Sequence, residues 1–237
     1  MKNRQLAKVA GLLYLGNIIT GVFSELVVRS SLIVPGDATA TAAKISGSEF
    51  LFRLGVISDL MMMVLFLLFP YCLFLLLKSV RKSIARLMMH FVVIGVAIMS
   101  INMLNSMAPL FLLGGADYLK AFSTGQLFSL ALFFMNMHEF GYILAAIFYG
   151  TWLLPLGFLV YKSGIFPRSL GVLLMVASLG HLSQLVQFIL APKVEALSYP
   201  GLAIATVAEL SFCLWLLIKG AKEFGGIHGE NPLAATT

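Results

Sequence analysis

Long apolar runs separated by short polar stretches extend from near the start of the chain to about residue 219. Six of these runs are long enough to cross about 30 Å of hydrocarbon as helices. They lie at about 7–28, 50–77, 86–113, 128–161, 168–190 and 200–219. This pattern predicts an all-α integral membrane bundle of six transmembrane helices. We expect one domain over residues 1–222 and a flexible cytoplasmic tail at 223–237.

Composition narrows the class of protein further. Hydrophobic residues make up 60% of the 237 positions and charged residues 11%, whereas soluble domains average about a quarter charged residues. The mean hydropathy of +0.98 points to a multi-pass protein with the bilayer as its main partner. The net charge of +6 comes from basic residues in short runs between the spans. We interpret these runs as topology signals rather than as a nucleic-acid-binding surface.

The fourth run raises a question of topology, because residues 124–161 include no Lys or Arg over 38 positions. One straight helix of this length would measure about 57 Å, and two crossings would need a turn near 136–138. A single crossing places 11 basic residues on one side and 5 on the other, and two crossings remove this asymmetry. The positive-inside rule therefore favours six helices with both termini cytoplasmic. The fourth helix is then long and bent, with 117–135 interfacial or extending outward.

The N-terminus and the connections carry further signals. The first run is too long for a secretory signal and predicts an uncleaved membrane helix. Asp37 follows a Pro-Gly turn signal and is placed to cap a short helix to about residue 43. Ser46 and Glu49 have the spacing of a capping box at the start of the second span. Gly164 fits a helix C-cap, and Pro167 fits the first turn of the next helix.

Polar side chains inside the spans are the candidate site. Ionisable groups are costly in hydrocarbon, so they usually face the interior of the bundle and find partners there. With alternate helices running outward, most of these groups fall in the middle or outer half of the membrane, and the inner half is almost wholly apolar. The sequence therefore predicts a polar pocket open to the outside. Its candidate residues are Glu25, Asp59, Asn102, Asn105, His138, Glu139, His181, Gln184 and Glu209.

Each candidate also has a structural interpretation. Asn and Gln often form hydrogen bonds between membrane helices. Glu25 and Arg53 lie near the interface, where they are able to snorkel or pair, and His90 lies beside the basic edge. The deeper carboxylates and histidines would form an ion-pair network in this interpretation. Cys72 and Cys213 lie within spans and are expected to be small buried hydrophobes, without a disulfide or zinc site.

Contiguous motifs in the second half of the chain are distinctive. They are HEFGY at 138–142, FYG at 148–150, Gly157, and YKSGIFPRSLGVLL at 161–174. These motifs resemble those of a family of bacterial multi-pass membrane proteins known as domain of unknown function 4386. The resemblance covers about residues 6–222. It implies a bacterial cytoplasmic (inner) membrane location and no particular activity, and it suggests that His138, Glu139 and 161–168 matter to the fold or the site. The chain departs from the family pattern at Phe140 and His181, where Tyr and an aromatic residue are commoner.

Three functions remain open, and whether the chain is an enzyme is undecided. The first is a pocket that binds or moves a small solute, ion or lipid, since carboxylates and a mid-membrane His suit proton-coupled movement. The second is a structural or regulatory membrane protein. The third is an intramembrane metal-dependent hydrolase with His138, Glu139 and His181 as possible ligands, although the chain contains no H-E-x-x-H motif. No cofactor is otherwise expected, and the oligomeric state is open.

Overall fold

The computed structural model describes residues 3–223, and every regular element within that range is helical. Six helical stretches are long and apolar enough to cross a membrane. They are Asn3–Leu32, Glu49–Leu77, Lys82–Leu112, Thr124–Ser163, Arg168–Leu190 and Tyr199–Ile218. The prediction of an all-helical chain with six such helices is confirmed. The predicted tail at 223–237 lies outside the described residues apart from its first position.

Several spans are built from more than one element. The first comprises α1 (Asn3–Val22), a π-helical segment η1 (Phe23–Arg29) and the short α2 (Ser30–Leu32). The fourth comprises α6 (Thr124–Thr151) and α7 (Leu153–Ser163). The other spans are α4 (Glu49–Leu77), α5 (Lys82–Leu112), α8 (Arg168–Leu190) and α9 (Tyr199–Ile218). The connections contain α3 (Ala38–Gly47) and two 3₁₀ turns, η2 (Asp117–Ala121) and η3 (Glu195–Leu197).

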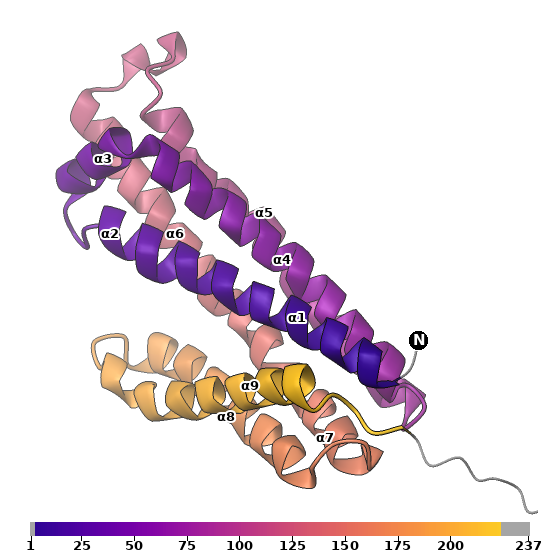
Figure 1. Ribbon diagram of the computed structural model, residues 1–237. Helices are drawn as coiled ribbons and strands as arrows, with labels where there is room; N and C mark the ends of the chain where they lie inside the picture. Colours follow the sequence, from indigo (N-terminus) through magenta and orange to yellow (C-terminus); the bar gives the residue numbers. More distant parts are fainter. Residues whose placement is uncertain (1–2, 224–237) are drawn as a thin grey trace, which may run out of the picture.

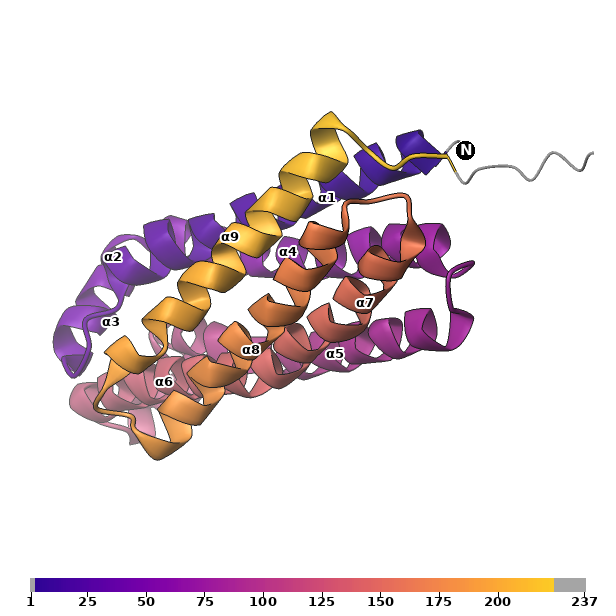
Figure 2. The same cartoon turned by 90° about the horizontal axis from the view of Figure 1, so that it is seen from below.

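The spans form a closed ring. Each packs against the next in the order α1, α4, α5, α6, α8 and α9, and α9 returns to α1. Viewed from below, α7, α8 and α9 lie in front of α1, α4, α5 and α6 (Figure 2). The start of α1 and the end of α9 meet, since Gly220 lies against Arg4. We call this end, which also holds the basic loops near 78–82 and 162–168, the basic end (Figure 1). The opposite end is the α3 end.

The fourth span is interrupted at Trp152. Helix α6 runs without a break through 136–138, so no turn divides the segment there. Pro155 has no backbone N–H to donate to the residue four positions earlier, and this loss separates α6 from α7. A capping box between Ser123 and Gln126 starts α6. The interruption therefore lies closer to the basic end than the bend expected near residue 135.

An aromatic cluster fills the ring near its middle. The rings of Tyr14 and Phe69 stack with centroids 4.2 Å apart. Phe66 and Phe69 meet Trp152 edge to face at 5.4 and 5.6 Å, and Phe66 meets Tyr149 at 4.8 Å. These five residues, the aromatic cluster, join α1, α4 and the α6–α7 junction. Below it, toward the basic end, the core is apolar and mostly aliphatic, with one further ring pair, Phe166 and Phe212.

Two of the expected caps are present, and a third is displaced. The Asp37 side chain accepts a hydrogen bond from the Ala40 N–H at 2.8 Å and caps α3, as predicted. Gly164 ends α7 with a φ of 68°, a backbone conformation that favours glycine. Pro167 is the N-cap residue of α8 rather than a residue of its first turn.

The predicted capping box of Ser46 and Glu49 is wrong. Ser46 belongs to the last turn of α3, and Ser48 stands at the N-cap of α4 without a side-chain cap bond. Glu49 instead pairs with Arg53 one turn later, at 2.6 Å. Ser48 alone connects α3 to α4. Ser46, which the predicted capping box needs as an N-cap residue, is therefore already part of α3.

Helices α8 and α9 approach closely where Gly180 faces Gly201. A Cβ added at Gly180 would collide with the backbone carbonyl of Gly201, which cannot turn aside as a side chain would. Small residues at such crossings allow the backbones of membrane helices to touch.

The Gly180→Ala variant should lower the free energy of unfolding by about 1–3 kcal/mol, the usual cost of overpacking. Gly125→Ala is the matched control, because nothing lies near its added Cβ. We expect it to leave stability unchanged or slightly higher. Denaturant-induced unfolding of both variants in detergent measures the difference, and equal stabilities would contradict the close crossing.

A polar cavity at the α3 end

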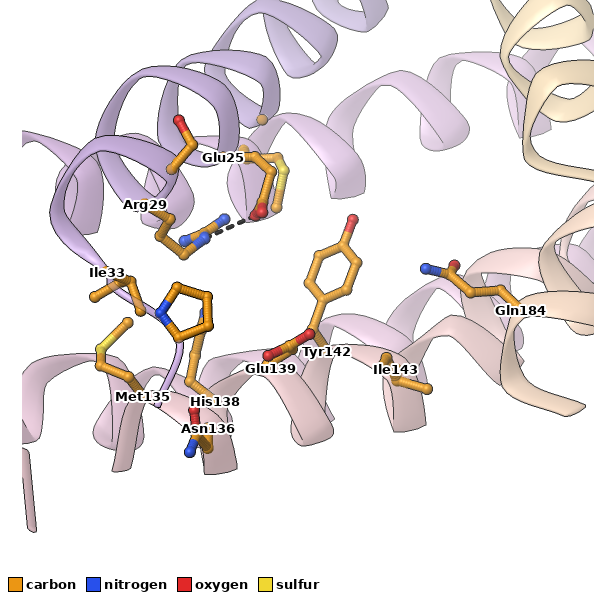
Figure 3. A pocket seen from close by; sticks show the side chains of 14 residues that line it. Glu25, Arg29, Ile33, Met135, Asn136, His138, Glu139, Tyr142, Ile143 and Gln184 are labelled. Carbon is orange, nitrogen blue, oxygen red and sulfur yellow. Dashed lines mark hydrogen bonds and ion pairs between the residues drawn. The ribbon is translucent and has the colours of Figure 1, made fainter. Parts of the chain in front are cut away.

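A cavity of about 450 Å³ lies within the ring toward the α3 end. One wall comes from the first span and the segment after it, and the other comes from α6 and α8 (Figure 3). Apolar parts of the lining include Met62, Met135 and Ile143. Its polar residues are Glu25, Arg29, Ser30, Asn136, His138, Glu139, Tyr142 and Gln184.

Arg29 holds two carboxylates together at one wall. Its Nη1 and Nη2 donate to Oδ2 and Oδ1 of Asp59, at 2.7 and 3.4 Å. Its Nε donates to Glu25 at 2.8 Å. Asp59 is 1% exposed, whereas the Glu25 side chain is 62% exposed and borders the cavity. A buried carboxylate needs a charge partner of this kind, because the ion has left water.

The π-helical segment η1 places Glu25 and Arg29. In it the backbone N–H of Ser30 bonds the carbonyl of Glu25, five residues back. The helix therefore continues past Val28, and Arg29 stays on the same side as Glu25, one turn away. The Ser24 hydroxyl donates a hydrogen bond to the Gly55 carbonyl of α4 at 3.3 Å, which fixes η1 against the helix that carries Asp59.

His138 is buried on the opposite wall. The Asn102 Nδ2 donates to the His138 carbonyl at 2.8 Å, and Asn105 Nδ2 donates to Asn102 Oδ1 at 3.0 Å. The His138 Nδ1 lies 3.4 Å from the Asn102 carbonyl oxygen and 3.3 Å from its Nδ2. The other ring nitrogen, Nε2, is buried and has no hydrogen-bond partner among the described residues. Such an atom is unusual in a native protein and calls for an explanation.

Gly141 allows this contact between α5 and α6. A Cβ at residue 141 would collide with the side-chain amide of Asn102. The motif at 138–142 therefore combines a histidine that faces the cavity with a glycine that lets Asn102 reach its backbone.

A second polar network lies deeper and outside the cavity lining. Glu209 accepts from the Tyr14 hydroxyl and bonds His181 Nε2, each at 2.6 Å. It ties α1, α8 and α9 together beside the aromatic cluster, to which Tyr14 belongs. Both carboxylate oxygens of Glu209 are engaged, so this network is internally satisfied.

The predicted site residues divide into three groups. Glu25, His138, Glu139 and Gln184 line the cavity. Asp59, Asn102 and Asn105 stand behind that lining, bonded to Arg29 or to the His138 segment. His181 and Glu209 form the separate network.

The possible metal ligands do not gather at one place. His138 and Glu139 border the cavity, but His181 is bonded to Glu209 and does not border it. Among residues 3–223, no group of three His, Cys, Asp or Glu side chains is arranged to hold a metal ion. The proposed ligand set of a metal-dependent hydrolase is therefore not brought together.

Five polar residues of the cavity lining and the deeper network are not among the predicted site residues, namely Arg29, Ser30, Asn136, Tyr142 and Tyr14. Arg29 lies one residue past the predicted end of the first span at about residue 28, so the sequence places it in the loop that follows. Its spacing of four from Glu25 was a usable signal, since such pairs meet on a helix. Tyr142 belongs to the distinctive 138–142 motif, which was a usable signal, whereas Tyr14 is a tyrosine within an apolar span and carries no signal of its own.

The chain was compared with known protein families and structures. A family model described as "Domain of unknown function (DUF4386)" matches residues 9–220. The chain belongs to this family. An uncharacterized protein of Archaeoglobus fulgidus is 38% identical over 94 residues, which cover 38% of this chain and 49% of the relative. The match thus spans about half the length of that relative. No solved structure matches the chain.

Family membership confirms the resemblance inferred from the motifs. The match extends from the first span into the last, so it covers both the cavity and the deeper network. The cavity residues of the 138–142 motif and the Gly164 cap both lie within the matched region.

Removing Arg29 should be far more damaging than removing Arg53. Both arginines follow a glutamate by four residues, but only Arg29 also pairs with a buried carboxylate. Arg29→Gln should lower the free energy of unfolding by about 3–5 kcal/mol, because it leaves Asp59 buried without its partner. Arg53→Gln should cost less than about 1 kcal/mol, as exposed pairs do.

Unfolding in detergent measures both variants. The double variant Arg29→Met/Asp59→Leu should recover most of the loss, because no buried charge remains. Similar losses for Arg29→Gln and Arg53→Gln would show that Asp59 does not depend on Arg29.

Substitutions of Glu209 in the deeper network should lower the free energy of unfolding, by an amount that depends on how many of its hydrogen bonds they remove. Glu209→Leu leaves the buried Tyr14 hydroxyl and His181 without an acceptor, and should cost about 1–3 kcal/mol. Glu209→Gln keeps one side-chain oxygen and should cost less. The same unfolding assay tests the order, and equal costs would contradict a stabilising role for these hydrogen bonds.

Proposed function

We propose that this protein is a solute-binding membrane protein whose polar cavity opens to the outside of the cell. The observation that carries the proposal is the buried His138 Nε2, which has no hydrogen-bond partner among the described residues and belongs to a cavity wall. A bound solute would satisfy this atom. Pockets for small molecules typically measure about 300–1,000 Å³ and combine apolar walls with a few polar groups, and this cavity has both properties.

The distribution of basic residues supports this orientation of the protein in the membrane. Lys and Arg concentrate in the N-terminal stretch and in the loops of the basic end, and cytoplasmic loops carry such an excess. Both termini would then be cytoplasmic and the α3 end would face outward. The protein would lie in the cytoplasmic membrane, in line with the bacterial inner-membrane location expected from the family resemblance.

Binding is favoured over open conduction. On α1, α4 and α6, the residues of the aromatic cluster lie between the cavity residues and the basic end. Tyr14 and Trp152 are each 1% exposed, and the apolar core continues beyond them. Movement of the solute across the membrane would require this cluster to open, and the interruption at Trp152 is where the α6–α7 backbone would yield.

A structural or regulatory role is the second candidate. The direct pairing of Arg29 with Asp59 and of Glu209 with Tyr14 and His181 favours it, because such contacts hold helices together. It gives no account of the cavity or of His138 Nε2.

Cysteine accessibility in intact cells tests the proposal. In a Cys72→Ala/Cys213→Ala background, single cysteines are introduced by Gln184→Cys in the cavity, Gly125→Cys at the exposed start of α6 and Ser79→Cys at the basic end. A membrane-impermeant thiol reagent should modify the first two from outside. Ser79→Cys should react only after permeabilisation.

Two results would contradict the proposal. An unreactive Gln184→Cys beside a reactive Gly125→Cys would mean that the cavity does not open to water. Reaction of Ser79→Cys alone in intact cells would reverse the orientation.

A further inference from the structure

We propose that the cavity selects organic monocations, namely small compounds with an ammonium group on an apolar body. This inference rests on the proposed function and specifies the class of solute. Three features of the lining carry it: its charge, the commitment of Arg29, and the acceptor and aromatic groups opposite.

Negative charge exceeds positive charge at the site. Among the described residues that line the cavity, Glu25 and Glu139 are acidic and Arg29 alone is basic. Asp59 lies directly behind Arg29 and adds a further carboxylate. The lining and the carboxylate directly behind it thus hold three carboxylates and one guanidinium among the described residues. This balance attracts a cation in a medium that screens charge less than water does.

Arg29 is already paired with two carboxylates of the protein. Its Nε is bonded to Glu25, and its Nη1 and Nη2 are bonded to Asp59. These bonds use three of its five N–H groups, and the two carboxylates that accept them already outweigh its charge, so a phosphate or carboxylate ligand would meet excess negative charge there. The single positive group of the lining therefore neutralises the protein's own charge.

His138 supplies an acceptor. With the ring proton on Nδ1, the ring donates to the Asn102 carbonyl oxygen at 3.4 Å, and Nε2 keeps its lone pair. Asn102 Nδ2 already has an acceptor at 2.8 Å in the His138 carbonyl, so His138 Nδ1 is not needed as an acceptor for it. An ammonium N–H would satisfy the buried Nε2.

The remaining lining suits an organic cation better than a metal ion. Tyr142 projects from α6 into the space between Glu25 and Gln184 (Figure 3), and an aromatic ring attracts an ammonium group placed over its face. Met62 and Met135 add polarizable apolar surface. Within residues 3–223, no group of three His, Cys, Asp or Glu side chains is placed to bind a metal ion.

The first test compares two thiol reagents of opposite charge at Gln184→Cys. One carries a trimethylammonium group and the other a sulfonate, and both are methanethiosulfonates. Each rate is divided by the rate of the same reagent at Gly125→Cys, which corrects for intrinsic reactivity. The cationic reagent should be favoured in the cavity by about tenfold.

Neutralising one carboxylate should reduce that preference. Glu139→Gln in the Gln184→Cys protein should reduce it about threefold or more. Glu49→Gln is the matched control, because it removes the same charge at the exposed start of α4. It should leave the preference unchanged. Equal rates for the two reagents, or faster modification by the sulfonate, would overturn the inference.

The second test uses protection of Gln184→Cys by three probes of similar size, namely butylammonium, 1-butanol and butyrate. At millimolar concentrations butylammonium should slow modification in purified protein reconstituted into phosphatidylglycerol vesicles, and the other two should not. Protection by butyrate or butanol alone, or by none of the three, would overturn the inference.

A lipid headgroup and a free amine share this ammonium chemistry. Vesicles that also contain phosphatidylethanolamine distinguish the two sources. Slower modification in these vesicles without added probe would assign the site to the headgroup, and an unchanged rate with butylammonium protection would assign it to a soluble amine. An accessible Gln184→Cys without charge preference would refute only the cation selectivity, whereas an inaccessible one would refute the proposed function itself.

Discussion

The pairing of Arg29 with Asp59 is the constraint on which the α3 end of the molecule depends. Neither charge is tolerable alone in an apolar ring, because an uncompensated ion loses its hydration. The pair therefore fixes the first span against α4, and the π-helical turn of η1 keeps Arg29 in reach. Glu25 is attached to the same guanidinium and is held at the cavity edge. A contact that stabilises the fold thus also sets the charge of the site.

The aromatic cluster divides the ring into two environments. Toward the α3 end, α1, α4 and α6 contribute polar groups and leave a cavity. Toward the basic end, α1, α4 and α7 contribute mainly aliphatic side chains to a core that also includes the Phe166 and Phe212 rings. Glu209 lies at the level of the cluster, where Tyr14 belongs to both the hydrogen-bonded network and the aromatic stack. Any change that opened the cluster would therefore disturb α1, α8 and α9 together.

The sequence predicted the features that depend on composition along one helix, namely the spans and several cavity residues. It missed the features that depend on how the helices face each other. Six spans follow from the length of the apolar runs, and Glu25, His138, Glu139 and Gln184 follow from the rarity of polar groups within them. The predicted end of the first span at about residue 28 left Arg29 in a loop, although its spacing of four from Glu25 indicates a shared helix face. The sequence also did not show that His138 and His181 belong to different polar networks, since both lie at membrane depths that suit the predicted pocket. Their separation is set by the order of helices around the ring, which spacing within one helix cannot specify.

Polar groups within the bundle differ in whether they have hydrogen-bond partners, and this difference argues for a ligand rather than for stability alone. Arg29, Asp59 and Glu209 each have direct partners, and Asn102 is bonded on both sides of its amide. Among the described residues, two buried side-chain polar atoms have no hydrogen-bond partner, Ser178 Oγ and His138 Nε2. A serine hydroxyl within a helix has the backbone carbonyl one turn back within easy reach, whereas the His138 ring has no such local acceptor or donor for Nε2. A bundle selected only for cohesion would gain by replacing this imidazole with an apolar ring of similar size. Its presence on the cavity wall, beside an excess of carboxylates, is what a site shaped for a hydrogen-bonding cation requires.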